Sequence, residues 1–118
     1  MSRHLVSTDQ VAVSYIALRA RVIDLLRSTP ESSGNIMVPC TPAWTVRQLA
    51  AHLVGVPEDI LAGRMEGVAS DAWTQAQVER FGHLALTELA DMFEGSAPRI
   101  DGILHHIPQP IISQFVMD

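Results

Sequence analysis

The stretch Thr45-Val46-Arg47-Gln48-Leu49-Ala50-Ala51-His52-Leu53 opens the clearest helical pattern in the chain. Thr45 and Gln48 fit a capping box, in which the threonine hydroxyl accepts a backbone N–H of the first turn and the glutamine side chain reaches back to the N-cap N–H. Apolar residues follow at helical spacing, namely Val46, Leu49, Leu53, Val56 and Ile60. We therefore predict a helix over residues 46–64, with a kink at Pro57, which cannot donate a hydrogen bond to the Leu53 carbonyl.

The same Ser/Thr-x-x-Gln pattern precedes two further segments with helical periodicity. It occurs at Ser7–Gln10 and at Thr74–Gln77, and these positions predict helices over residues 8–28 and 75–94. The first helix would bury a stripe made of Val11, Tyr15, Ile16, Leu18, Val22, Ile23, Leu25 and Leu26. The other would bury Val78, Phe81, Ala85, Leu89 and Met92. Apolar spacings of four and three residues are typical of helices in a bundle.

The C-terminal part of the chain continues the helical pattern in shorter pieces. After Gly95-Ser96 we predict a helix over residues 97–107, with Pro98 in its first turn. A helical stub over residues 111–118 follows, with its apolar stripe formed by Ile111, Ile112, Phe115 and Val116. No segment shows the strict alternation of a half-buried strand. The predicted class is all-α, with residues 1–118 forming a single domain.

Composition excludes several classes of protein. A chain of 118 residues that is 47% hydrophobic and 18% charged buries a core of its own and is not intrinsically disordered. The net charge of −5, with arginine as the only strong base, disfavours nucleic acid and anionic membranes as partners. No apolar run approaches the length that spans a bilayer. Cys40 is the single cysteine, which fits a reducing compartment, and we expect a cytoplasmic protein.

The segment from Pro42 to Gly55 carries a family resemblance. Its pattern Trp-Thr-Val-Arg at residues 44–47, followed in the next turn by His52, resembles the second-helix signature of the DinB-like superfamily. More narrowly, it resembles the N-terminal domain of mycothiol-dependent maleylpyruvate isomerase, and the similarity extends through residues 61–64 and 73–78. The resemblance implies an up-and-down four-helix bundle. Residues 111–118 would then be an incomplete last helix, which we expect the pairing of two chains to complete.

The resemblance also implies a metal-dependent function. Family members hold a divalent metal, often zinc or nickel, with one histidine from the second helix, and His52 matches that ligand. The further ligands come from the fourth helix, at positions just beyond the one that matches Asp118. Several members use a low-molecular-weight thiol such as mycothiol on small electrophiles such as maleylpyruvate. The implied activity is therefore that of a thiol-dependent isomerase or S-transferase.

Two alternatives stand beside this expectation. The chain has one matching ligand, whereas a zinc site needs three or four, so it is either an enzyme whose remaining ligands come from elsewhere or a non-catalytic helical binding module. We also expect a homodimer that forms through the C-terminal apolar segment, because an exposed apolar helix end marks an interface.

Other residues have plain structural interpretations that compete with functional ones. His52 lies at the edge of an apolar face, where a packed, hydrogen-bonded histidine is common. His83 falls on the polar side of its helix and fits a solvated residue, whereas His105 and His106 end a helix and are alternative metal ligands. Cys40 fits a small buried filler or a thiolate near the start of a helix. We expect Trp44 to pack against the first turn of its helix as a hydrophobic staple. We expect Arg19 either to form an ion pair within the protein or to bind a substrate carboxylate.

Overall fold

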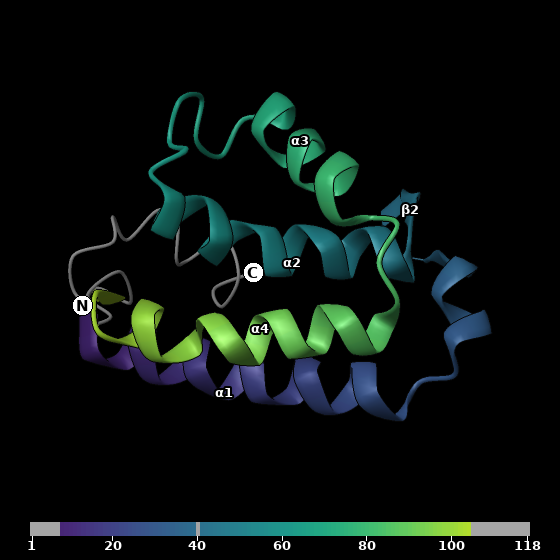
Figure 1. Ribbon diagram of the computed structural model, residues 1–118, viewed down its shortest axis with the longest axis horizontal. Helices are drawn as coiled ribbons and strands as arrows, with labels where there is room; N and C mark the ends of the chain where they lie inside the picture. The colour runs from purple at the N-terminus through teal and green to yellow at the C-terminus, as the bar shows by residue number, and fades with distance from the viewer. Residues whose placement is uncertain (1–7, 40, 105–118) are drawn as a thin grey trace, which may run out of the picture.

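The computed structural model describes residues 8–39 and 41–104 and consists mainly of helices (Figure 1). Its elements in chain order are α1 (Thr8–Ser28), the short 3₁₀ helix η1 (Glu31–Asn35), β1 (Met37–Val38), β2 (Thr41–Thr45), α2 (Val46–Ala62), α3 (Asp71–Phe81) and α4 (Leu86–Asp101). The predicted all-α class is therefore confirmed. Among these residues no helix is long and apolar enough to cross a membrane.

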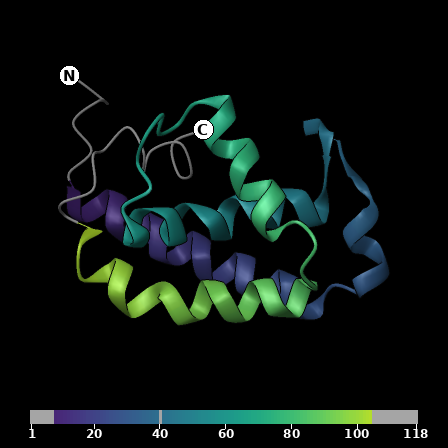
Figure 2. The ribbon, with the colours of Figure 1, turned by 45° about the horizontal axis from the view of Figure 1, so that its top comes forward.

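Successive α-helices run in opposite directions, as the resemblance implied. Helix α4 packs against both α1 and α2, and α3 lies on the other side of α2 (Figures 1 and 2). All four helices contribute to one hydrophobic cluster. Its most deeply buried side chains are Ala51, Val54, Leu86, Leu89, Ala90, Phe93 and Ile100. Helix α4 is thus the central element of the core.

Helix α1 has the predicted bounds, but its buried stripe is narrower than predicted. Tyr15, Ile23 and Leu26 are buried, whereas Leu25 is 63% exposed and Ile16 is 40% exposed. The reason is that α1 packs chiefly against α4 and leaves an open groove toward α2. The groove has a volume of about 290 Å³ and is lined by Val22, Leu25, Leu26, Thr29, Val46, Leu49, Ala50 and Leu53.

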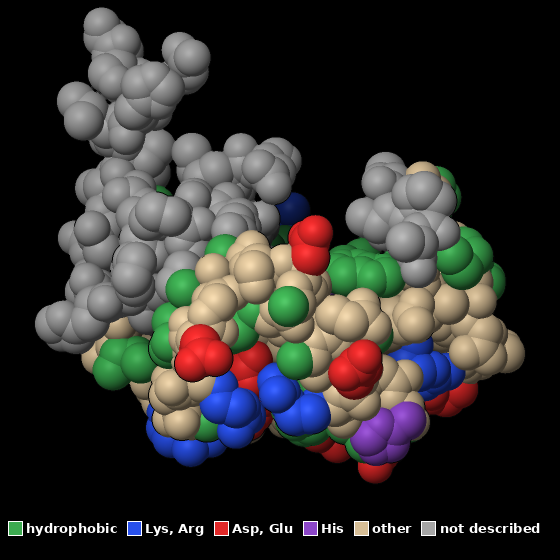
Figure 3. Space-filling view, turned by 90° about the horizontal axis from the view of Figure 1, so that it is seen from above, with side chains coloured by type: hydrophobic (Ala, Val, Ile, Leu, Met, Phe, Trp, Pro, Cys, Tyr) green, Lys and Arg blue, Asp and Glu red, His purple; other side chains and the backbone are tan. Residues whose placement is uncertain are grey.

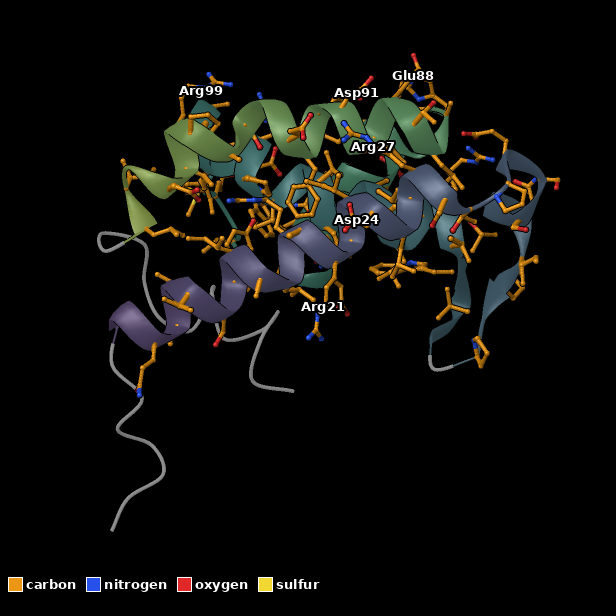
Figure 4. The ribbon with its side chains drawn as sticks, turned by 90° about the horizontal axis from the view of Figure 1, so that it is seen from below. Arg21, Asp24, Arg27, Glu88, Asp91 and Arg99 are labelled. Carbon is orange, nitrogen blue, oxygen red and sulfur yellow. The ribbon has the colours of Figure 1, made fainter. Side chains whose placement is uncertain are left out.

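Ion pairs join α1 to α4 at the surface. Arg27 donates hydrogen bonds from Nη2 to Asp91 at 3.0 Å and to Glu94 at 2.9 Å. Figure 4 shows Arg27 between the two helices near Asp91, whereas Arg21 points away from α4. Because these charges are exposed to solvent, the ion pairs add little to the stability of the protein. Their main effect is on the orientation of α1 relative to α4.

Helix α2 begins as the sequence predicts. The Thr45 hydroxyl accepts a hydrogen bond from the Gln48 N–H at 3.2 Å, and Gln48 Oε1 accepts one from the Thr45 N–H at 2.9 Å. The helix continues through Pro57 and ends at Ala62, two residues before the predicted end. Gly63 ends it in the left-handed conformation, with a φ of 76° that favours glycine.

The predicted helices over 75–94 and 97–107 are wrong in their bounds. Ser70 caps α3 by accepting from the Trp73 N–H at 3.2 Å, so Thr74 lies inside the helix and Thr74–Gln77 is not a capping box. The chain then leaves the helix between α3 and α4, within the predicted 75–94 segment. Helix α4 continues through Gly95-Ser96 and Pro98, where a new helix was predicted to begin.

The start of α4 depends on residues far away in the sequence. Glu31 of η1 accepts hydrogen bonds from the Leu86 N–H at 2.9 Å and the Thr87 N–H at 3.3 Å. Arg47 donates to the Leu84 carbonyl at 2.9 Å and to the Glu31 carbonyl at 3.0 Å. A carboxylate at a helix N-terminus satisfies orphan N–H groups and complements the helix dipole. This contact explains why α4 begins where no local signal predicted it.

A short hairpin precedes α2 and was not predicted. Strand β1 pairs with β2 in antiparallel register, with Met37 opposite Thr45 and Val38 opposite Thr41. Two residues of β1 are too few to display alternation, so the sequence carried no strand signal there. Ser7, Cys40, residues 105–107 and the stub at 111–118 lie outside the described residues, and the predictions for them stay predictions.

We predict that a methyl group at Gly55 destabilises the protein, because α3 approaches α2 most closely there. A Cβ at Gly55 would lie 2.7 Å from Cβ and 2.8 Å from Cγ of Gln77. Gly55→Ala should lower the free energy of unfolding by about 1–3 kcal/mol, the usual effect of overpacking. Urea titration followed by circular dichroism measures the change.

Gly95→Ala is the matched control, because a Cβ at that position of α4 has no neighbour within 4 Å. It should raise the free energy of unfolding by about 0.5–1 kcal/mol, since alanine restricts the unfolded chain more than glycine does. Equal effects of the two substitutions would contradict the close contact of α3 with α2.

Candidate functional site

His52 lies on α2 where this helix faces α3, and two side chains hold its ring. The Nδ1 atom is 2.6 Å from Oε1 of Gln77, which belongs to α3. Trp44, just before the N-cap of α2, packs its indole against the imidazole with ring centroids 5.4 Å apart and planes tilted by 51°. The capping box at Thr45 fixes the entry to α2, so Trp44 is placed two turns before His52 on the same side. The ring is half-buried.

Gln77 connects His52 to a buried carboxylate. The Gln77 side chain is fully buried and donates from Nε2 to Oδ2 of Asp59 at 2.9 Å. Asp59 is only 1% exposed, and its Oδ1 accepts from Arg80 at 2.6 Å and from Arg64 at 2.9 Å. A buried charge is tolerated when it is paired and hydrogen-bonded in this way. His52, Gln77 and Asp59 therefore form a continuous hydrogen-bonded chain, which we call the His52 relay.

The structure around the relay explains why α3 docks where it does. Trp73 is 7% exposed and donates from Nε1 to the Arg64 carbonyl at 2.8 Å, which ties the start of α3 to the end of α2. Arg64 lies in the connection just after α2 and Arg80 in the last turn of α3, and both reach Asp59. Figure 3 looks onto the side of the molecule where α3 lies, and arginine and acidic side chains alternate there.

The environment of His52 favours its neutral form. Burial lowers the pKa of the imidazole below its ordinary value, and the hydrogen bond to Gln77 opposes that shift only in part. These surroundings therefore favour the uncharged ring, which is the form that binds metal ions and accepts protons. The structure thus brings His52 into a polar cluster rather than leaving it as an isolated edge residue.

The other candidate ligands do not join His52 in the described part of the chain. His83 lies in the connection between α3 and α4 and is exposed, so its interpretation as a solvated residue is confirmed. Across residues 8–39 and 41–104, no three His, Cys, Asp or Glu side chains converge as a metal-binding group would. His105, His106 and Cys40 lie outside this range.

Arg19 forms an ion pair between α1 and α4, as one of its two interpretations predicted. Its guanidinium binds Asp101 through two hydrogen bonds of 2.7 and 2.8 Å, and the arginine is only 6% exposed. The bidentate contact occupies the face of the group that would hold a substrate carboxylate. Arg19 also lies over the ring of Tyr15, with its Cζ 5.6 Å from the ring centroid.

Asp59, Gln77 and Arg80 were missed in the sequence, although one signal was present. Asp59 follows His52 by seven residues, so the two lie on the same side of α2, and a carboxylate there within an apolar helix indicates a buried polar contact. Gln77 carried a misleading signal, because its spacing from Thr74 fits a capping box. Only the docking of α3 reveals its true partners.

The fold and the His52 relay define a class of protein: an antiparallel helical bundle with a neutral histidine held on its second helix by a buried amide and carboxylate. The family model for the mycothiol maleylpyruvate isomerase N-terminal domain matches residues 15–108. The match covers more than half of the chain, so the chain belongs to this family. No curated protein and no solved structure gives a significant match.

We predict that the hydroxyl of Tyr15, which lies beneath Arg19, titrates near pH 12. Burial raises the pKa of Tyr15 from 10.0 to about 12, against a smaller opposing effect of Arg19. Since the folded pKa exceeds the unfolded one, the stability linked to Tyr15 is fully present below pH 10 and is lost as the pH rises through 12. Tyr15 is the single tyrosine, so its tyrosinate absorbance after a stopped-flow pH jump reports this residue alone.

The same titration in concentrated urea is the control and should give a midpoint near 10. A midpoint near 10 for the native protein would show that Tyr15 is open to solvent and would contradict the burial described above.

Proposed function

We propose that this chain is a divalent-metal-binding domain that serves a low-molecular-weight thiol in an isomerase or S-transferase reaction on small electrophiles such as maleylpyruvate. The observation that carries the proposal is the half-buried imidazole of His52, held through Nδ1 by Gln77, at the position that matches the metal ligand of the family. Metal-binding histidines almost always donate their other N–H to a carboxylate, a carbonyl oxygen or water, and His52 has the side-chain carbonyl oxygen of Gln77 as such a partner.

The donor chemistry of His52 fits zinc or nickel, and two further ligands must come from elsewhere. Zinc takes three or four protein ligands, and the described residues bring no second or third one to His52. His105, His106 and a second subunit are the sources that the sequence offers. A bound divalent metal would deprotonate a coordinated thiol at neutral pH and make it a nucleophile.

The residues of this chain would prepare that chemistry. Trp44 covers one side of the imidazole and Gln77 holds its Nδ1, so the ring has little freedom to rotate. The close contact of α3 keeps water away from the buried Asp59. These residues would hold the ligand in place before metal or thiol arrives, which reduces the entropy lost on binding.

The test of the proposal is the metal content of the protein, measured by elemental analysis. The full chain should be purified without chelators and without a polyhistidine tag, then titrated with zinc chloride by calorimetry. We expect about one zinc or nickel ion per site. His52→Ala should weaken zinc binding at least about 10–100-fold, because that loss already follows when a residue that only hydrogen-bonds to a metal ligand is removed. His83→Ala is the matched control, because His83 is exposed, and it should leave zinc binding unchanged.

Each other outcome has a defined meaning. If the folded protein binds no metal, the proposal fails and the chain is a non-catalytic helical binding module, which is the alternative function. If zinc binds equally well to His52→Ala, the metal site exists but does not include His52.

We also propose that two copies of the chain pair, with the C-terminal apolar segment of one copy covering the groove between α1 and α2 of the other. That segment, residues 111–118, lies outside the described residues. What supports the proposal is the aliphatic lining of the groove, to which Thr29 is the one polar contributor. Pairing of this kind would also bring residues of the second copy to α2, which carries His52.

Two substitutions on α1 distinguish this pairing from general surface association. Leu25→Glu places a charge in the groove, whereas Val13→Glu places one at an equally exposed position of α1 that does not line it. We predict a dimer for the wild type and for Val13→Glu, and a monomer for Leu25→Glu, by size-exclusion chromatography with light scattering. A wild-type monomer at high concentration, or loss of the dimer in both variants, would exclude the pairing.

A further inference from the structure

The His52 relay contains a directional chain of donors and acceptors. Asp59 is buried, and two guanidinium groups on its Oδ1 stabilise it as a carboxylate, which can only accept hydrogen bonds. Gln77 lies 2.9 Å from Oδ2 of Asp59 and must therefore turn its NH₂ group toward that atom. The side-chain amide of Gln77 therefore has one favourable orientation, because its NH₂ group donates hydrogen bonds and its Oε1 atom only accepts them.

The orientation of the amide decides which nitrogen of His52 carries the proton. With its NH₂ on Asp59, Gln77 presents Oε1 to His52, and Oε1 lies 2.6 Å from Nδ1. A carbonyl oxygen is an acceptor only, so Nδ1 must be the donor. In the neutral ring Nε2 is then the nitrogen with the lone pair.

We infer that Gln77 and Asp59 are positioning residues, which hold neutral His52 as the Nδ1–H tautomer and so make Nε2 its acceptor nitrogen. Neither residue touches the atom that would meet a metal or a substrate. Asp59 acts through Gln77, and Gln77 acts through the far side of the ring. The arginines at Asp59 complete the arrangement, because both pair with Oδ1 and leave Oδ2 to Gln77.

The close packing of α3 supports the same conclusion. Gly55 leaves room for the Gln77 side chain to lie directly on α2, where a Cβ would collide with it. Gln77 is fully buried and thus has no water to satisfy its amide. Reversing the amide would place Oε1 against the Asp59 carboxylate, which is also an acceptor, and would leave that buried contact unsatisfied.

The experiment is nuclear magnetic resonance of the metal-free full chain, with the histidine ring nitrogens labelled with ¹⁵N, at pH 8. The His52 signals are identified by their loss in His52→Ala. We expect a protonated, pyrrole-type shift for Nδ1 and an unprotonated, pyridine-type shift for Nε2. A protonated Nε2 in the wild type would overturn the inference, and this result needs no variant to fold.

A variant of Gln77 tests whether the amide is the cause. Gln77→Leu removes the acceptor, and His52 should move toward the Nε2–H form that a histidine side chain favours in water. Trp73→Phe is the control, because it loses the bond to the Arg64 carbonyl and loosens α3 without touching the relay. It should keep the wild-type tautomer, whereas an unchanged tautomer in Gln77→Leu would overturn the role of Gln77.

The consequence for metal binding rests on the proposed function, but the tautomer does not. Calorimetry with zinc chloride should show about 10–100-fold weaker binding for Gln77→Leu than for the wild type, as for other outer partners of metal-bound histidines. If the wild type binds no zinc and yet shows the Nδ1–H tautomer, the proposed function fails and the inference on Gln77 and Asp59 stands. If zinc binds and the tautomer is Nε2–H, the inference on Gln77 and Asp59 fails and the proposed function stands.

Discussion

The carboxylate of Asp59 is buried between α2 and α3, and the arrangement of that side of the bundle depends on it. Removing a charge from water is costly, and here the cost is offset by Arg64, Arg80 and Gln77, which all donate to the same carboxylate. Two of these partners belong to α3, so the short helix has one position at which the charge is satisfied. A helix of eleven residues is marginal by itself, and packing and polar contacts such as these hold it in place.

The start of α2 is held by several separate contacts. Within the stretch from Trp44 to Arg47, each polar or aromatic side chain has a separate structural task. Thr45 caps the helix, Arg47 ties η1 to Leu84 in the connection before α4, and Trp44 covers the ring of His52. The stretch that resembles the family signature is thus the segment that assembles the end of the bundle around His52. Its residues position the histidine and need no direct part in chemistry.

Local signals predicted the first half of the chain better than the second. The helix at 8–28 and the capping box at Thr45 are both confirmed, and the capping box rests on contacts within one turn. The start of α4 rests on Glu31, which is distant in sequence, and no local pattern reveals such a contact. For the same reason Gln77 was mistaken for a capping residue, although its partners are His52 and Asp59. His52 itself was found through the resemblance, whereas its two supporting residues required the packing of α3 on α2.

We propose that Asp59 and Gln77 orient His52 so that its Nε2 atom receives a divalent metal. An anomalous difference map at the zinc edge, from crystals of the full chain grown with zinc chloride, tests this most directly. We expect a peak about 2.0–2.1 Å from Nε2 of His52, the usual zinc–nitrogen distance, with Nδ1 still bonded to Gln77. A peak bonded to Nδ1, or zinc bound elsewhere with no density at His52, would contradict it.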